Sequence, residues 1–168
     1  MSQKSLFDRP EFDRSEFEKV APEKPAHRPG ANAIKANIDG GARGNPGPAA
    51  YGVVVRDAKG EIIAELSDYL GIQTNNYAEY SGLLAALDFA VRGKHPALKV
   101  LSDSELLVRQ MQGRYKVKSP GLIDLYGRAR ALVRKLDHFS IDHVLRHYNK
   151  EADALVNQVL DSQGRGAR

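Results

Sequence analysis

The sequence contains no cysteine and no tryptophan among its 168 residues. The absence of cysteine excludes disulfide bonds and thiolate metal sites, so a bound metal ion would need oxygen or imidazole ligands. No apolar run approaches the roughly 18 residues that a transmembrane helix needs. The N-terminus lacks the charged, apolar and small-residue order of a secretory signal. These absences favour a cytoplasmic protein without a membrane-spanning segment.

The composition that remains is that of one globular domain. Hydrophobic residues make up 42% of the chain and charged residues 27%, which is the balance of an ordinary soluble fold. The net charge is +4, and the basic excess lies after residue 33. Two basic stretches comprise Arg109, Arg114, Lys116 and Lys118 in one, and Arg128, Arg130, Arg134 and Lys135 in the other. Such a surface suits a polyanion such as nucleic acid, although a solvated helix face has the same pattern.

The first 33 residues differ from the rest of the chain. A loose five-residue repeat, FDRPE, FDRSE and FEKVA, begins at Phe7 and is followed by a segment rich in proline and charge. A period of five does not match the 3.6 residues of a helical turn, so Phe7, Phe12 and Phe17 cannot share one helix face. We interpret residues 1–33 as a disordered, charged tail and linker. Its three phenylalanines are a candidate motif for binding an unknown protein partner.

Periodicity predicts an α/β domain over residues 34–162, with a short C-terminal tail over 163–168. Strands are expected near 34–39, 50–57, 61–70, 98–101 and 139–145, and helices near 76–92, 103–112, 120–136 and 150–161. The resulting order is βββαβααβα. It predicts a five-stranded mixed sheet, with three antiparallel strands and then two parallel ones, flanked by helices.

Four acidic residues stand at the ends of these predicted elements. Asp39 ends the first strand, and Asp103 follows the fourth. Glu79 and Asp153 lie in the first turns of the first and last helices. Functional groups converge at one such edge of an α/β sheet, where oxygen ligands suit Mg²⁺ or Mn²⁺. Singly, each acid also has a structural explanation, as a helix cap, a partner of the helix dipole or the start of a turn.

Four motifs surround these acids in order along the chain. They are NIDGGARGNPGPAAYGVVV at 37–55, TNNYAEYSGLLAAL at 74–87, VLSDSELLVRQMQG at 100–113 and NKEADALVN at 149–157. Together they resemble the type 1 ribonuclease H family. The resemblance implies a ribonuclease H-like fold and an endonuclease that hydrolyses the RNA strand of RNA–DNA hybrids. It also implies two Mg²⁺ ions, or Mn²⁺, and products with 5′-phosphate and 3′-hydroxyl ends.

The resemblance implies a role for each matching residue. The metal-binding and catalytic acids are Asp39, Glu79, Asp103 and Asp153. The expected hybrid-binding residues are Gly40, Gly41, Arg43, Asn45, Thr74, Asn75, Asn76 and Ser104. The backbone of the glycine loop would approach the 2′-hydroxyls, and the asparagine amides would meet base edges in the minor groove.

The sequence departs from many family members in two places. It lacks their Trp- and Lys-rich protruding helix, which places it in a compact, archaeal-like branch and transfers hybrid binding to Arg114, Lys116 and Lys118. It also has only a short loop, LRHYNKEAD, where the family carries a catalytic histidine. His147 or Arg146 could act there, although His147 could equally be a surface residue, and His143 is assigned to the strand. We expect a monomer.

Three other functions fit parts of the pattern. A non-catalytic nucleic-acid-binding module on the same fold would be expected to have lost one or more of the acids, yet all four are present. A DNA-cutting relative such as a junction resolvase would not need the GNPG loop and the Asn-Asn pair. A sugar kinase-like protein would need a second, larger domain.

Overall fold

The computed structural model describes residues 33–166, so the predicted N-terminal tail and its phenylalanine motif lie outside the described residues. The strands are β1 (Ile34–Ala42), β2 (Gly47–Arg56), β3 (Ile62–Gln73), β4 (Ala97–Ser102) and β5 (His138–His143). The helices are α2 (Asn75–Arg92), α3 (Glu105–Met111), α4 (Pro120–Val133) and α5 (Lys150–Gly166). The predicted order is confirmed, with one extra 3-10 turn at Arg146–Tyr148. Within the described range no helix is long and apolar enough to cross a bilayer.

The five strands form one mixed sheet in the order β3-β2-β1-β4-β5. β1, β2 and β3 pair antiparallel, whereas β4 pairs parallel with β1 and β5 pairs parallel with β4. The predicted fold class is therefore confirmed. β1 lies at the centre, but β4 pairs with it only as far as Ile38, so Asp39 and the three residues after it pair with β2 alone.

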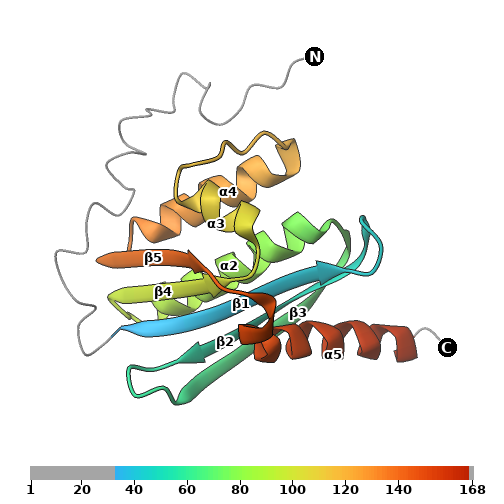
Figure 1. The fold of residues 1–168 in the computed structure, drawn as a ribbon, viewed down its shortest axis with the longest axis horizontal. Helices are drawn as coiled ribbons and strands as arrows, with labels where there is room; N and C mark the ends of the chain where they lie inside the picture. Colours follow the sequence, from blue (N-terminus) through green and yellow to red (C-terminus); the bar gives the residue numbers. More distant parts are fainter. Residues whose placement is uncertain (1–32, 167–168) are drawn as a thin grey trace.

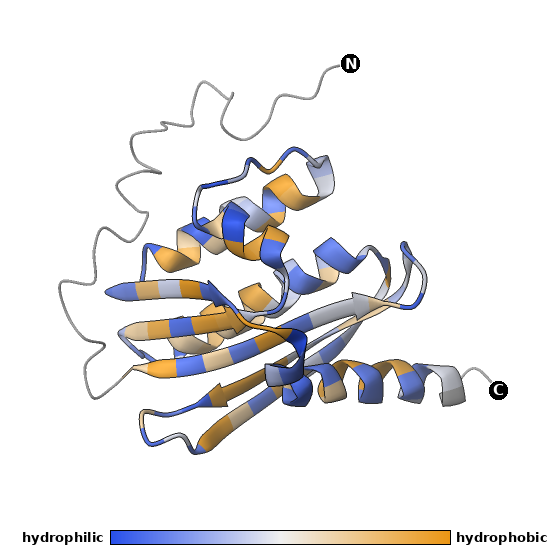
Figure 2. Cartoon of the chain, viewed as in Figure 1, coloured by the Kyte–Doolittle hydropathy of each residue, from blue (hydrophilic) through white to orange (hydrophobic). Residues whose placement is uncertain are grey.

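Helices cover the two faces of the sheet unequally (Figure 1). Ala36 and Ile38 of β1 pack into the main core together with residues of α2, α3 and α4. Alternation along the strand directs Asp39 to the opposite face. α5 covers part of that face, where Val156 and Leu160 pack together in a smaller cluster. Figure 2 shows the same division along α5, whose turns alternate between hydrophobic and hydrophilic residues.

Several predicted boundaries were wrong by a few residues. β1 continues to Ala42 because Gly40, Gly41 and Ala42 still pair with β2, so part of the expected loop is strand. α4 ends at Val133 rather than near residue 136. β5 ends at His143 rather than 145. α5 runs to Gly166 rather than to about residue 161.

Two glycines beside Asp39 allow helices to approach the sheet closely. A Cβ at Gly40 would lie 2.3 Å from the carbonyl carbon of Ala78 in α2. A Cβ at Gly52, the cross-strand partner of Asp39, would lie 2.5 Å from the carbonyl oxygen of Ala152 in α5. Both distances are shorter than any real Cβ contact. Close packing of α2 against β1 therefore requires glycine at position 40, and the expected role of its backbone in substrate binding stays a prediction.

Replacing Gly40 with alanine should destabilise the fold, because backbone atoms of α2 must move to admit the methyl group. We expect a loss of about 1–3 kcal/mol, typical of overpacking, measured by urea denaturation. The matched control is Gly127→Ala in α4, where an added Cβ meets nothing within 4 Å. That change should raise stability by about 0.4–1 kcal/mol. Equal effects at the two positions would contradict the packing argument.

Candidate active site

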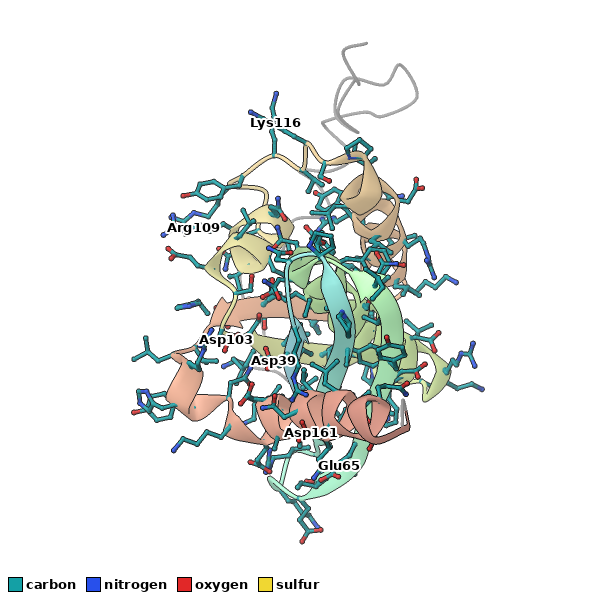
Figure 3. The ribbon with its side chains drawn as sticks, turned by 90° about the vertical axis from the view of Figure 1, so that its right-hand side faces the viewer. Asp39, Glu65, Asp103, Arg109, Lys116 and Asp161 are labelled. Carbon is teal, nitrogen blue, oxygen red and sulfur yellow. The ribbon has the colours of Figure 1, made fainter. Side chains whose placement is uncertain are left out.

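The four predicted acids come from four elements that meet at one edge of the sheet. Asp39 lies within β1, and Asp103 directly follows β4. Glu79 is the fifth residue of α2, one position deeper in the helix than predicted, because α2 begins at Asn75. Asp153 lies in the first turn of α5, as predicted. Figure 3 shows Asp39 and Asp103 near each other above α5.

Two of the structural explanations for these acids are wrong. The N-cap of α3 is Ser104, whose hydroxyl accepts a hydrogen bond from the backbone N–H of Leu107 at 3.2 Å, so Asp103 does not cap the helix. Asp39 does not open a turn, because β1 continues for three more residues. These two carboxylates therefore have no local structural task that explains them.

Burial and mutual repulsion shift the protonation of the acids. Burial, followed by repulsion from Asp103, raises the pKa of Asp39 to about 8. Burial also raises the pKa of Glu79 to about 7, against a lowering hydrogen bond with the Ser104 side chain. The pKa of Asp103 is raised by burial and by Asp153, while Arg146 opposes that rise. Shifts of this kind are typical of functional sites, because folding has placed like charges together without compensating them.

The donor set suits a small, hard cation. All four side chains offer carboxylate oxygens, which are the ligands that Mg²⁺ and Mn²⁺ prefer. Within residues 33–166, however, no three acidic or histidine side chains converge closely enough to hold one ion together. Mg²⁺ usually binds one or two carboxylates and completes its shell with water and substrate phosphates. The arrangement fits that mode and does not fit an ion enclosed by protein ligands alone.

Asn149 fixes the start of α5 against β1. Its amide is buried, donates to the carbonyl oxygen of Ile38 at 2.8 Å and accepts from Nδ2 of Asn37 at 3.1 Å. The backbone carbonyl oxygen of Asn149 accepts a hydrogen bond from the backbone N–H of Asp153 at 3.1 Å. Asn149 thus positions Asp153 beside Asp39. Asn149 stands in the last of the four motifs, where its only local signal for this role is its place just before a helix.

The asparagines of the glycine loop join that loop to α2. The backbone N–H of Asn75 donates to Oδ1 of Asn45 at 3.1 Å, and Oδ1 of Asn75 accepts from the N–H of Ala42 at 2.8 Å. Thr74 caps α2 by accepting from the N–H of Tyr77 at 3.2 Å. The Asn45–Pro46 peptide bond is cis. These predicted binding residues are brought together next to Glu79, and Asn76 follows them in the first turn of α2.

The loop before α5 places Arg146, not His147, near the acids. Nε of Arg146 lies 3.7 Å from Oδ2 of Asp103. The His147 ring instead packs against Tyr148, with 4.0 Å between ring centroids. His143 lies in β5 as predicted, but it ends that strand, and its charge lowers the pKa of Asp103. Register could have indicated this, because His143 pairs with Ser102 at the end of β4.

The predicted basic residues divide into three environments. Arg114, Lys116 and Lys118 are exposed between α3 and α4, and Figure 3 shows Lys116 at one end of the face that carries Asp39 and Asp103. Arg43 forms an exposed ion pair with Asp161 at 2.6 Å. Arg130 is only 2% exposed and donates to the carbonyl oxygen of Met111. The expectation that Arg130 contributes to a basic surface was therefore wrong.

Comparisons with known proteins agree with this geometry. Residues 37–159 match the reverse transcriptase-like family. A bifunctional protein of Mycobacterium tuberculosis is 46% identical over 135 residues, which are 80% of this chain but only 37% of that protein. Ribonuclease HI of Halobacterium salinarum is 43% identical over 76% of this chain and 64% of its own length. The solved RNase H1 in complex with RNA/DNA hybrid is 43% identical, with a TM-score of 0.73 over 77% of this chain and 98% of that one.

Removing the Asp39 carboxylate should stabilise the metal-free protein at neutral and alkaline pH. Because its pKa is raised from 3.8 to about 8, folding favours the protonated form, and the resulting stability is lost as pH rises from about 4 to about 8. Asp39→Asn should therefore lose less stability than the wild type between about pH 4 and 8, measured by urea denaturation with a chelator. Asp124→Asn, on the exposed side of α4, is the control. An unchanged pH dependence in Asp39→Asn would contradict the assignment.

Proposed function

This chain belongs to the ribonuclease H family, and from that membership we propose that it is an endonuclease hydrolysing the RNA strand of RNA–DNA hybrids. The observation that carries the proposal is the meeting of four carboxylates, three with raised pKa values, beside a loop of glycine and asparagine. The solved relative bound to RNA/DNA hybrid supports the substrate class.

We propose that Asp39, Glu79, Asp103 and Asp153 hold two Mg²⁺ or Mn²⁺ ions when substrate is bound. When bound, such ions activate a water for in-line attack on phosphorus and stabilise the leaving 3′-oxygen, which gives 5′-phosphate and 3′-hydroxyl ends. The protein contributes placement and charge. Asp39 is held by the central strand, and Asn149 fixes the turn that carries Asp153. Ionising the acids without cations is unfavourable, so cation binding and substrate binding should assist each other.

The loop and the start of α2 would read the hybrid. Within the described chain, Asn45 and Asn75 use their amide oxygens in internal hydrogen bonds, while their Nδ2 groups donate none. Base edges in the minor groove present mainly acceptors, so free amide donors suit them. Gly41 has room for a Cβ, which would meet only a Val156 methyl group at 3.7 Å. Packing within the protein therefore does not require glycine at position 41. The absence of a side chain there leaves the backbone open to approach by ribose 2′-hydroxyls.

The other members of the binding surface are proposals of the same kind. Gly40, Arg43, Thr74, Asn76 and Ser104 surround the acids or the loop. The exposed Arg114, Lys116 and Lys118 would neutralise backbone phosphates beyond the site, which makes affinity dependent on salt. A single chain supplies all four acids, so we propose that the enzyme acts as a monomer.

The function is tested with labelled RNA–DNA hybrid, RNA duplex and DNA duplex of one sequence, each with Mg²⁺ or Mn²⁺. We expect cleavage of the RNA strand in the hybrid, with a 5′-phosphate on the downstream product. Asp39→Asn should abolish this cleavage, because the variant lacks one of the four carboxylates proposed to bind the metal ions and keeps the fold. Cleavage of the DNA duplex in place of the hybrid would refute the proposal.

Arg146, rather than His147, should assist turnover. Arg146→Ala removes a positive charge 3.7 Å from Asp103, so single-turnover cleavage should slow by about tenfold, less than the roughly hundredfold or more that is lost with a general acid or base, because the arginine acts through its charge. His147→Ala should leave the rate unchanged, because that ring contacts Tyr148. Arg146→Lys, which keeps the charge, should recover part of the loss. A slow His147→Ala enzyme with a normal Arg146→Ala enzyme would reverse the assignment.

A further inference from the structure

An apolar groove lies between α2 and α4, on the side of the sheet that faces away from α5. Its volume is about 550 Å³, and its apolar lining is formed by Tyr51, Tyr77, Leu84, Leu125 and Leu132. All of these except Leu125 are only partly buried, so the groove offers apolar surface to solvent. We call it the α2–α4 groove. The four carboxylates of the candidate active site, the glycine loop and the basic residues after α3 do not line this groove.

The rim of the α2–α4 groove is positively charged. Arg92 and Arg128 line it together with a single acid, Asp88. Asp88 pairs with Arg92 at 3.0 Å, yet the Arg92 side chain is 80% exposed and can bind a further carboxylate. Arg128 is exposed and forms no ion pair within residues 33–166. An apolar channel with arginines at its edge suits a peptide that carries a large apolar side chain next to an acid.

The chain's own N-terminal segment contains that combination three times. Phe7, Phe12 and Phe17 are followed directly by Asp8, Asp13 and Glu18. These positions lie outside the described residues. Because a period of five cannot align the rings on one helix, each Phe-acid pair would bind separately. Three equivalent ligands on one linker raise the chance that one of them occupies the groove.

The chain enters the domain within reach of the groove. Ile34, the first residue of β1, pairs with Leu98 of β4, which lies six residues along the chain from Arg92 at the end of α2. The 17 peptide steps from Phe17 to Ile34 can span roughly 56 Å when the chain is extended. α2 has 18 residues, so its length is about 27 Å. Attachment at this point gives the linked segment an effective concentration near the millimolar range, so even weak binding would be populated.

We propose that the α2–α4 groove binds the Phe-acid repeats of the chain's own N-terminal segment, with a phenylalanine ring among the groove's tyrosines and leucines and the adjoining carboxylate beside Arg128 or Arg92. The groove lies on the face of the sheet opposite to Asp39, so this docking leaves the acids accessible. The proposal does not depend on the ribonuclease activity, and neither one fails with the other.

The absence of cysteine permits a direct test in the full chain. Ser15→Cys carries a nitroxide spin label within the second repeat, between Phe12 and Phe17, and backbone amide signals report its proximity. We expect strong broadening confined to the groove-lining parts of α2 and α4. Phe7→Ser, Phe12→Ser and Phe17→Ser made together should remove most of it, and these changes cannot unfold the domain because they lie outside it.

A charge test separates docking from random proximity. Arg92→Glu with Arg128→Glu should also remove most of the broadening, whereas Lys59→Glu with Lys99→Glu, an equal charge change at exposed positions outside the groove, should leave it unchanged. Broadening that is spread evenly over the surface, or that persists in the arginine variant, would overturn the proposal. So would equal broadening when spin-labelled and isotope-labelled chains are mixed, because a second copy would then be the occupant.

Discussion

The arrangement of the site depends on how closely two helices approach the end of one central strand. Gly40 follows Asp39 along β1, and Gly52 lies opposite Asp39 on β2. Each leaves no space for a Cβ, the first because of α2 and the second because of α5. The helices thereby deliver Glu79 and Asp153 to the strand that carries Asp39, from the two faces of the sheet. Parallel pairing of β4 with β1 adds Asp103 at the same edge.

This close approach has an electrostatic consequence. Carboxylates that are partly removed from water and placed together resist ionisation, and the pKa values of Asp39, Glu79 and Asp103 are all raised. Within the described chain, Arg146 supplies the one ion pair made to these acids, at the exposed end of the site. Binding of divalent cations and of substrate phosphate would relieve what folding has left uncompensated. The same groups that make the metal-free site unfavourable would therefore favour the binding of divalent cations.

The order of strands and helices along the chain, and the elements that carry the four acids, could be predicted from the sequence because both leave local signals. The alternation of buried and exposed residues in β1 and the helical period of α2 can be seen in short stretches of sequence. The four motifs that contain the acids follow one another along the chain. What the sequence did not reveal depends on contacts between distant segments. The burial of Arg130 under α3, the bond of Asn149 to Ile38 and the approach of His143 to Asp103 all join elements far apart in the chain. The close packing of α2 against Gly40 could likewise not be predicted, since a glycine-rich stretch of sequence is typical of a loop.

The most direct test of this account is where a divalent ion binds. Substoichiometric Mn²⁺ added to the isotope-labelled protein broadens the amide signals nearest to it. If the four carboxylates form one site, the amide signals of four residues on four different elements broaden together: Asp39, Glu79, Asp103 and Asp153. This broadening is lost in Asp39→Asn. Broadening centred on exposed acids elsewhere, such as Glu65, or at only one of the four positions, would contradict the claim that these carboxylates form one site.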